Sequence, residues 1–199
     1  GALGIIGILG IQGRDNMNYL GAETVKFLKE KGIYNQLDNV TGLARRYPNK
    51  FVLPIDFKVE LDGNVYEMTP DEINDHPNKD RMHLWGIGHR TVEMYKDILR
   101  ESRTAYIKGP PTLHSDPRFF PESKDIVDTI VALTKDGATT ILSGGDTDDL
   151  VKKSGYAPKE VVTHRTLAGG AATEFRAGKL LPGLLALNTT YNALNGLPL

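Results

Sequence analysis

The stretch Ile141-Leu-Ser-Gly-Gly-Asp-Thr-Asp-Asp149 decides the fold class of this chain. An apolar run over residues 138–142 ends in two glycines, and an Asp-Thr pair then opens an amphipathic segment. A strand that turns through glycines into a helix leaves the first helical N–H groups unpaired, and the helix dipole adds partial positive charge there. Such a turn can bind phosphate. Read alone, the pattern favours a plainer structure, a tight turn through Gly144 and Gly145 with Asp146 as helix cap.

Length and composition describe an ordinary globular protein. The 199 residues are enough for one large domain or two small ones, and 40% are hydrophobic and 25% charged. A formal net charge of −1 provides no attraction for nucleic acid, so no nucleic-acid partner is expected. The lack of cysteine excludes disulfides and thiolate chemistry. The apolar segment 1–10 is too short to span a bilayer, so no membrane span is expected.

Short apolar runs alternate along the chain with segments of helical periodicity. The expected strands are 4–9, 50–60, 104–107, 138–142 and 161–164, and the expected helices are 22–31, 36–46, 91–102, 123–135, 147–154 and 170–177. This alternation predicts an α/β fold, in which a parallel sheet has helices on both faces in a Rossmann-like three-layer arrangement.

The simplest organisation is a single domain over residues 1–199. Residues 60–81 form the exception, because this polar segment contains prolines and is expected to be an irregular surface excursion. Within it, Asp62-Gly63 lies between two short apolar-polar alternations and predicts a β-hairpin.

Three glycine-bearing turns follow expected strands in the second half of the chain. They are Lys108-Gly-Pro-Pro111, Ser143-Gly-Gly-Asp-Thr147 and Arg165-Thr-Leu-Ala-Gly-Gly-Ala171. In a parallel sheet the three turns emerge at one edge, where backbone N–H groups can surround a polyphosphate.

Several motifs, taken in order, resemble those of one family. In the first half of the matching region, Lys50-Phe-Val-Leu-Pro-Ile-Asp-Phe57 is similar to the family motif "K-(I/L)-L-L-P-V-D-(V/F)", and Leu84-Trp-Gly-Ile-Gly88 is similar to "G-L-D-I-G". Thr104-Ala-Tyr-Ile-Lys-Gly-Pro110 is similar to a strand that ends in "N-G-P", and Ser143-Gly-Gly-Asp-Thr147 is similar to "G-G-G-D-T". Ala168-Gly-Gly-Ala-Ala-Thr-Glu174 is similar to "G-G-G-A-S-L-E", and Gly178-Lys-Leu-Leu-Pro-Gly183 is similar to "G-K-x-L-P-G". From about residue 50 to 187, more than two-thirds of its length, the chain resembles the C-terminal, nucleotide-binding domain of phosphoglycerate kinase.

The resemblance implies transfer of a phosphoryl group between 1,3-bisphosphoglycerate and ADP, with ATP/ADP and Mg²⁺ as nucleotide and ion. It also implies a partner, either an N-terminal glycerate-binding domain or a protein assembly. The residues implied to bind the nucleotide are Gly144, Gly145, Asp146, Thr147, Gly109, Pro110 and Trp85, with Asp146 as the Mg²⁺ ligand. Gly169 and Gly170 are implied to donate N–H groups to the phosphoryl group in transfer.

Departures from the family pattern fall on functional positions. Gly10-Ile-Gln-Gly-Arg-Asp-Asn-Met17 stands where the family has "G-G-A-K-V-S-D-K", so Arg14 is the only cation there that can take the role of the lysine. Ser115 stands at the position of a carboxylate. Ser143 and Ala168 replace the first glycines of two triplets, which adds side chains where a phosphate approaches the backbone.

Two functions therefore stay open. The chain is either the nucleotide-binding half of an active kinase or a catalytically inactive relative that serves as a structural or partner-binding subunit. The N-terminal substrate domain has no counterpart in these residues, and the region before residue 50 is shorter than in the family, through deletion or through residues missing from the sequence. The histidines lack a spacing such as His-x-x-x-His, so no histidine metal site is expected. The expected location is cytoplasmic, with an organelle as the alternative.

Overall fold

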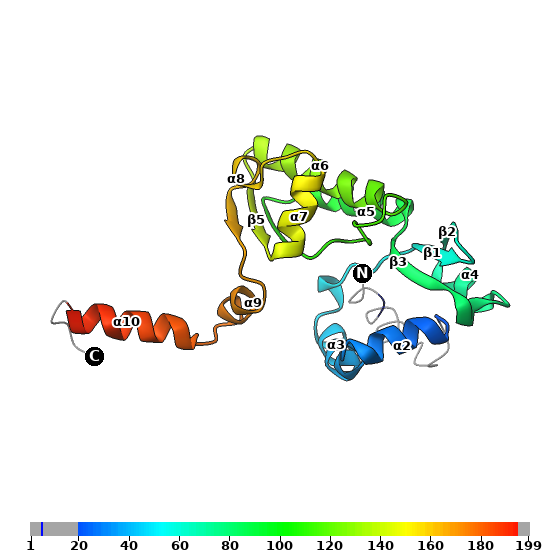
Figure 1. The fold of residues 1–199 in the computed structure, drawn as a ribbon, viewed down its shortest axis with the longest axis horizontal. Coiled ribbons are helices and arrows are strands. Elements are labelled where there is room, and N and C mark those ends of the chain that lie inside the picture. The colour runs from blue at the N-terminus through cyan, green and yellow to red at the C-terminus, as the bar shows by residue number, and fades with distance from the viewer. Residues whose placement is uncertain (1–4, 6–19, 195–199) are drawn as a thin grey trace.

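A computed structural model describes residue 5 and residues 20–194. The described residues form two three-stranded sheets, with strand orders β2-β1-β3 and β4-β5-β6 (Figure 1). The strands are β1 (Phe57–Leu61), β2 (Asn64–Met68), β3 (His83–Ile87), β4 (Thr104–Lys108), β5 (Thr139–Ser143) and β6 (His164–Thr166). The α-helices are α2 (Ala22–Glu30), α3 (Leu37–Arg46), α4 (Pro70–Asp75), α5 (His89–Arg100), α6 (Phe120–Lys135), α7 (Gly145–Lys153), α8 (Pro158–Val161), α9 (Gly170–Arg176) and α10 (Pro182–Leu194). Apart from Ile5, the expected strand 4–9 lies outside the described residues, as does Arg14.

The sheet β4-β5-β6 is parallel, and Ile107 of β4 lies opposite Leu142 of β5. Helices α6 and α7 bury apolar side chains against this pair of strands, in a core that contains Leu142, Val127 and Leu150. Because side chains alternate along a strand, Tyr106 lies on the opposite face. There the guanidinium of Arg176, at the end of α9, lies 3.6 Å from the centroid of the tyrosine ring. The predicted α/β fold with a parallel sheet is confirmed.

The sheet β2-β1-β3 is antiparallel. Asp62 and Gly63 join β1 to β2 with φ values of +52° and +81°, so the predicted hairpin is confirmed and its turn has positive φ at both central residues. The rest of segment 60–81 is not irregular, because it contains α4 and the 3₁₀ turn Lys79–Arg81. Thr69 and Glu72 cap α4 reciprocally. Ile73 anchors that helix in a second hydrophobic core, which contains Phe57 and Val59 of β1.

The expected strand 50–60 is wrong in its first half. Residues Pro48–Lys50 form a 3₁₀ turn, and the strand begins only at Phe57. The buried carboxylate of Asp56 explains the break, since it accepts hydrogen bonds from the backbone N–H groups of Arg90 at 3.0 Å and Thr91 at 2.8 Å. Asp56 thus caps the N-terminus of α5 from a distant segment, directly before the strand begins at Phe57.

Two connections tie the sheets together. Lys58 of β1 forms an ion pair of 2.6 Å with Glu122 in the first turn of α6, and both side chains are largely buried. The loop after β4 packs against β3, where Gly86 bridges to Thr112 and the N–H of Leu113 donates to the carbonyl of Trp85 at 2.7 Å. This loop therefore spans the two sheets.

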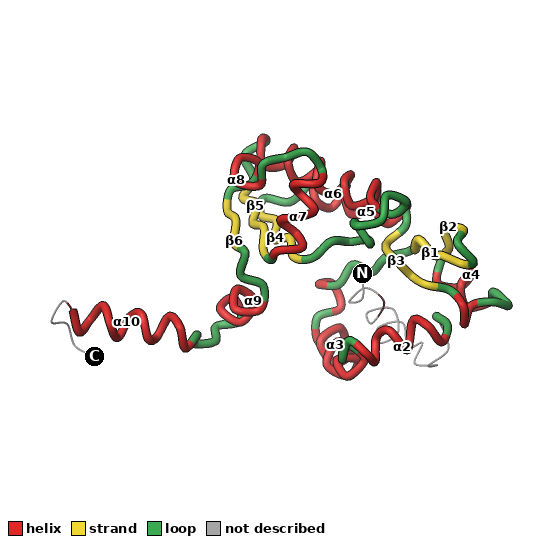
Figure 2. The backbone as a smooth tube through the Cα atoms, in the orientation of Figure 1, coloured by secondary structure: helices red, strands yellow, loops and turns green. Residues whose placement is uncertain are grey.

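The C-terminal elements differ from the rest of the structure. The expected strand 161–164 is shifted, because α8 ends at Val161 and β6 begins at His164. Helix α10 was not expected, and it extends away from the body that contains the sheets, with exposed Leu184 and Leu187 (Figures 1 and 2). Within the described residues, no helix is long and apolar enough to cross a membrane.

Candidate functional site

The three glycine-bearing turns meet at the carboxyl ends of β4, β5 and β6. The N–H of Gly109 donates to the hydroxyl of Thr147 at 2.8 Å, and that hydroxyl donates to the carbonyl of Ser143 at 2.8 Å. The N–H of Gly144 donates to the carbonyl of Thr166 at 3.0 Å. The turns are thus linked by direct hydrogen bonds, as the sequence predicted for one edge of a parallel sheet. Thr147 is buried and its hydroxyl is used within the turn.

The N-terminus of α7 is open. Gly144 is its N-cap, with φ of +95°, and no side chain in the described part of the chain caps the helix. The following residues, Gly145 and Asp146, are exposed. Within the described residues the carboxylate of Asp146 makes no hydrogen bond or ion pair, so the plainer interpretation of Asp146 as a helix cap is wrong. Free N–H groups beside an exposed carboxylate can bind a phosphate together with a cation.

The next acidic residues of α7 are occupied. Asp148 is buried and pairs with Arg165 and with Lys152, and the Arg165 guanidinium is the main cause that lowers the pKa of Asp148 to about 2. Asp149 pairs with Lys153 at 3.0 Å and with His114 at 3.1 Å. Sequence reasoning missed both pairings. Of these three aspartates, Asp146 is the one whose carboxylate makes no hydrogen bond or ion pair within the described part of the chain.

The side chain of Ser143 is directed into the protein and not toward solvent at the turn. That side chain is buried, and its hydroxyl donates to the carbonyl of Ala168 at 2.8 Å. Ser143, which replaces the first glycine of the triplet at 143–145, therefore binds the backbone of the second triplet at 168–170. The extra side chain is buried, whereas Gly145 is exposed.

Lys108 is a cation that sequence reasoning missed. It is exposed at the carboxyl end of β4, and its ammonium group donates to the hydroxyl of Thr173 at 2.7 Å. Thr173 lies in the first turn of α9, where its hydroxyl donates to the carbonyl of Gly169 at 3.0 Å. The ammonium group therefore lies near the turn that contains Gly169 and Gly170. The sequence signal was present, because Lys108 directly follows the expected strand 104–107 and precedes a glycine.

An apolar cavity of about 220 Å³ lies beyond the loop after β4. Trp85 and Pro110 both line it, together with Phe27 and Leu84. The indole N–H of Trp85 donates to Glu60 at 3.0 Å, so the orientation of the ring is fixed. Gly109 faces the strand ends while Pro110 faces the cavity, so this dipeptide connects the two parts of the candidate site.

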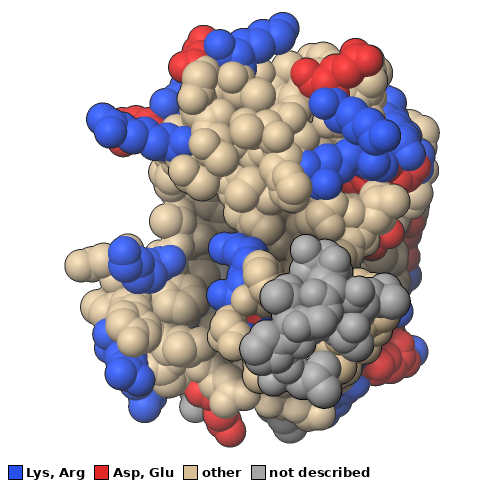
Figure 3. Space-filling model, turned by 90° about the vertical axis from the view of Figure 1, so that its left-hand side faces the viewer, with Lys and Arg blue, Asp and Glu red and all other residues tan. Residues whose placement is uncertain are grey.

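The surface on the side of α9 and α10 is hollowed. Figure 3 shows a recess between the upper and lower parts of the molecule, with Lys or Arg side chains beside it. Basic groups at a recess attract anionic ligands even when the formal net charge is only −1.

Glycine turns that gather at the carboxyl ends of parallel strands define the class of α/β domains that bind a ligand at this edge. The family model for phosphoglycerate kinase matches residues 8–179. The phosphoglycerate kinase of Plasmodium falciparum is 34% identical over 136 residues, which cover 68% of this chain and 32% of the relative. That of Emericella nidulans is 31% identical over 150 residues, 75% of this chain and 35% of the relative.

Comparison with solved structures also indicates similarity to phosphoglycerate kinase. The crystal structure of phosphoglycerate kinase from Pyrococcus horikoshii OT3 matches with a TM-score of 0.74 and 27% identity, over 96% of this chain and 44% of that one. The chain belongs to the phosphoglycerate kinase family, and it corresponds to the C-terminal domain. It spans between 32% and 44% of the length of these relatives.

Proposed function

We propose that this chain is the nucleotide-binding half of a phosphoglycerate kinase-type phosphotransferase and that it binds ADP and ATP with Mg²⁺. The observation that carries the proposal is the open N-terminus of α7, where exposed Gly145 and Asp146 follow a turn that other residues hold in place. Family membership supports it, since functional members act on these nucleotides.

The residues at the strand ends would divide the work of binding. The N–H groups of Gly145 and its neighbours would bind the phosphates, and Asp146 would hold the Mg²⁺, which neutralises charge on the phosphate oxygens. Gly169 and Gly170 would donate N–H groups to the phosphoryl group in transfer. Lys108 would add a positive charge near that group, a role for which the sequence offered only Arg14.

The apolar cavity would hold the base. Trp85 and Pro110 line it, and Gly109 lies between the cavity and the phosphate turn. A nucleotide whose base enters the cavity and whose phosphates reach α7 would therefore pass along Gly109. Phosphoryl transfer further requires a glycerate-binding domain, because both substrates must be held in line. We propose an N-terminal domain or a protein assembly as this partner.

Calorimetric titration with Mg²⁺-ADP and Mg²⁺-ATP tests the proposal. We expect saturable binding in the micromolar range and its loss in Asp146→Ala. The matched control is Asp149→Ala, which removes the same charge from the next turn of α7 and should bind within about twofold of the parent chain. Absence of binding at millimolar nucleotide, or equal losses in both variants, would refute the nucleotide site.

The alternative function is that of an inactive relative with a structural or partner-binding role. Arg14 in place of a lysine and Ser115 in place of a carboxylate favour it. Ser143 in place of glycine does not favour an inactive relative, because its hydroxyl is bonded to the carbonyl of Ala168 and leaves the turn before α7 open for a phosphate. An assay of ATP formation, with the N-terminal domain of a relative added in trans, separates the two functions. Nucleotide binding without turnover would support the inactive relative.

A further inference from the structure

A cluster of side chains with metal-ligating groups lies between α5 and α6 and includes no residue of the three glycine-bearing turns. His89, Glu93 and Asp125 each offer one ligand atom, and these atoms all lie within 4.8 Å of one another. His89 and Glu93 are one turn apart on α5, so they share a face of that helix. Asp125 comes from α6, which means that two helices contribute to the cluster.

The helices hold these positions firmly. Val92 of α5 packs in the same core as Ile126 and Ile130 of α6, so the backbone on both sides of the cluster is anchored. Within the described residues, the side chains of His89 and Asp125 make no hydrogen bond or ion pair, although their ligand atoms lie within 4.8 Å of each other. Both ligand atoms can therefore turn toward an ion without breaking a hydrogen bond of the described structure.

Within the described part of the chain, the Lys96 ammonium competes with a metal ion for Glu93, because the Glu93 carboxylate accepts a hydrogen bond of 2.6 Å from it. The Lys96 ammonium would have to yield to a metal ion.

We propose that His89, Glu93 and Asp125 form a binding site for a divalent transition-metal ion, and specifically for Zn²⁺. One imidazole nitrogen and two carboxylate oxygens are ligands that Zn²⁺ accepts, whereas Mg²⁺ prefers oxygen alone. Zinc bonds of about 2.0–2.2 Å place ligand atoms roughly 3.3–3.5 Å apart, so side-chain rotations that move the ligand atoms together by up to about 1.5 Å close the cluster. A fourth position stays free for water.

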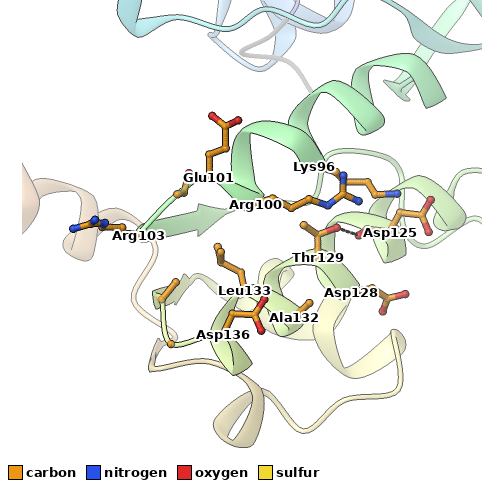
Figure 4. Close-up of a pocket in the computed structure, with 13 residues that line it drawn as sticks. Lys96, Arg100, Glu101, Arg103, Asp125, Asp128, Thr129, Ala132, Leu133 and Asp136 are labelled. Atoms are coloured by element: carbon orange, nitrogen blue, oxygen red, sulfur yellow. Dashed lines mark hydrogen bonds between the residues drawn. The ribbon is translucent and has the colours of Figure 1, made fainter.

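A groove of about 850 Å³ runs beside the cluster, lined by residues of the C-terminal part of α5 and of α6. Asp125 and Lys96 both line it, and Figure 4 shows them at the same end, with Arg100 between them and the rest of the groove. His89 is exposed, so a hydrated ion can reach the cluster directly from solvent. Sequence reasoning missed the site because Asp125 lies on a different helix and no second histidine stands at metal-binding spacing.

Calorimetric titration of the chain with Zn²⁺, in a buffer that does not chelate it, tests the site. We expect one ion per chain, and affinity at least tenfold lower in His89→Ala and in Asp125→Asn. The matched controls are His164→Ala, an exposed histidine of β6, and Asp136→Asn, another aspartate of the same groove. Both controls, and Asp146→Ala at the phosphate turn, should bind within about twofold of the parent chain.

Lys96→Met distinguishes metal binding by His89, Glu93 and Asp125 from a merely structural role of these side chains. Removing the competing ammonium should tighten Zn²⁺ binding severalfold. Co²⁺ supplies a second readout, because a site with an imidazole ligand gives visible absorption bands distinct from those of the hydrated ion, and His89→Ala should abolish them. Circular dichroism verifies that each variant is folded. Absence of saturable binding at millimolar Zn²⁺, parent-like affinity in His89→Ala, or equal losses in His164→Ala would overturn the proposal.

Discussion

Replacing Asp56 with alanine should destabilise the chain by about 3 kcal/mol. Loss of a helix cap costs about 1–2 kcal/mol, and Asp56 is the residue whose carboxylate accepts the N–H groups of Arg90 and Thr91 at the start of α5. Thr91 is fully buried, so its N–H would be left without a partner at a further cost of about 1–3 kcal/mol. For a chain of this length, this corresponds to a decrease of about 6–12 °C in the melting temperature.

Thermal unfolding followed by circular dichroism measures this decrease. Asp56→Asn keeps one acceptor oxygen and should lie between the parent chain and Asp56→Ala. Asp97→Ala is the control, since Asp97 lies on the same helix in an exposed ion pair with Arg100 and should change the free energy of unfolding by less than about 0.5 kcal/mol. If Asp56→Ala melts within about 2 °C of the parent chain, the cap does not hold α5 and the reasoning is wrong.

The remaining predictions concern charges elsewhere in the structure. The pKa of Asp148 is lowered to about 2 from its ordinary value of 3.8, so the stability that this carboxylate contributes is present above about pH 4 and is lost as the pH falls toward 2. Arg165→Met should flatten this part of the pH profile measured by urea unfolding. Lys108→Met should lower the affinity for Mg²⁺-ADP about three- to tenfold in calorimetry while the melting temperature stays nearly unchanged, because the side chain is exposed. Lys58→Met should destabilise the chain by about 3 kcal/mol, because it leaves Glu122 charged and buried, and adding Glu122→Gln should recover part of this loss in thermal unfolding.

Each of these predictions has an outcome that would contradict it. An unchanged acid profile in Arg165→Met would show that the pair with Asp148 does not set the acid limit. Parent-like ADP affinity in Lys108→Met would remove the lysine from the proposed phosphate site. If the Lys58 and Glu122 substitutions destabilise additively, the two side chains are not coupled.

The sequence predicts those parts of the fold that depend on local pattern. The strands at 104–107 and 138–142 are confirmed to within a residue or two, and so is the hairpin at Asp62-Gly63, because glycine and apolar alternation act over short distances. Strand β3 was missed because the pairing of Gly86 with β1 joins segments far apart in the sequence. The break before Phe57 was missed for the same reason, since the cap that Asp56 provides is seen only in three dimensions.

The candidate site was predictable in its position and less so in its chemistry. The expectation of a parallel sheet placed the turns that contain Gly109, Ser143 and Gly169 at one edge, and hydrogen bonds join these turns in the structure. The direction of a side chain is set by packing, which the sequence does not reveal. Hence neither the buried hydroxyl of Thr147 nor the contact of Lys108 with α9 was expected. The assigned roles in nucleotide binding stay predictions.

The hydrogen bond from Ser143 to Ala168 bears on how such chains are judged for activity. If activity were judged from the number of residues that differ from a family motif, Ser143 would be counted as a damaging substitution. Its hydroxyl instead couples two turns that are separated in the chain, so the backbone of the second turn depends on the residue chosen at the first. A return to glycine at this position would loosen that connection. Whether a substitution in one glycine triplet is tolerated thus depends on the residue present in the other triplet. Ser143 and Ala168, which each look damaging alone, can therefore be compatible when they occur together.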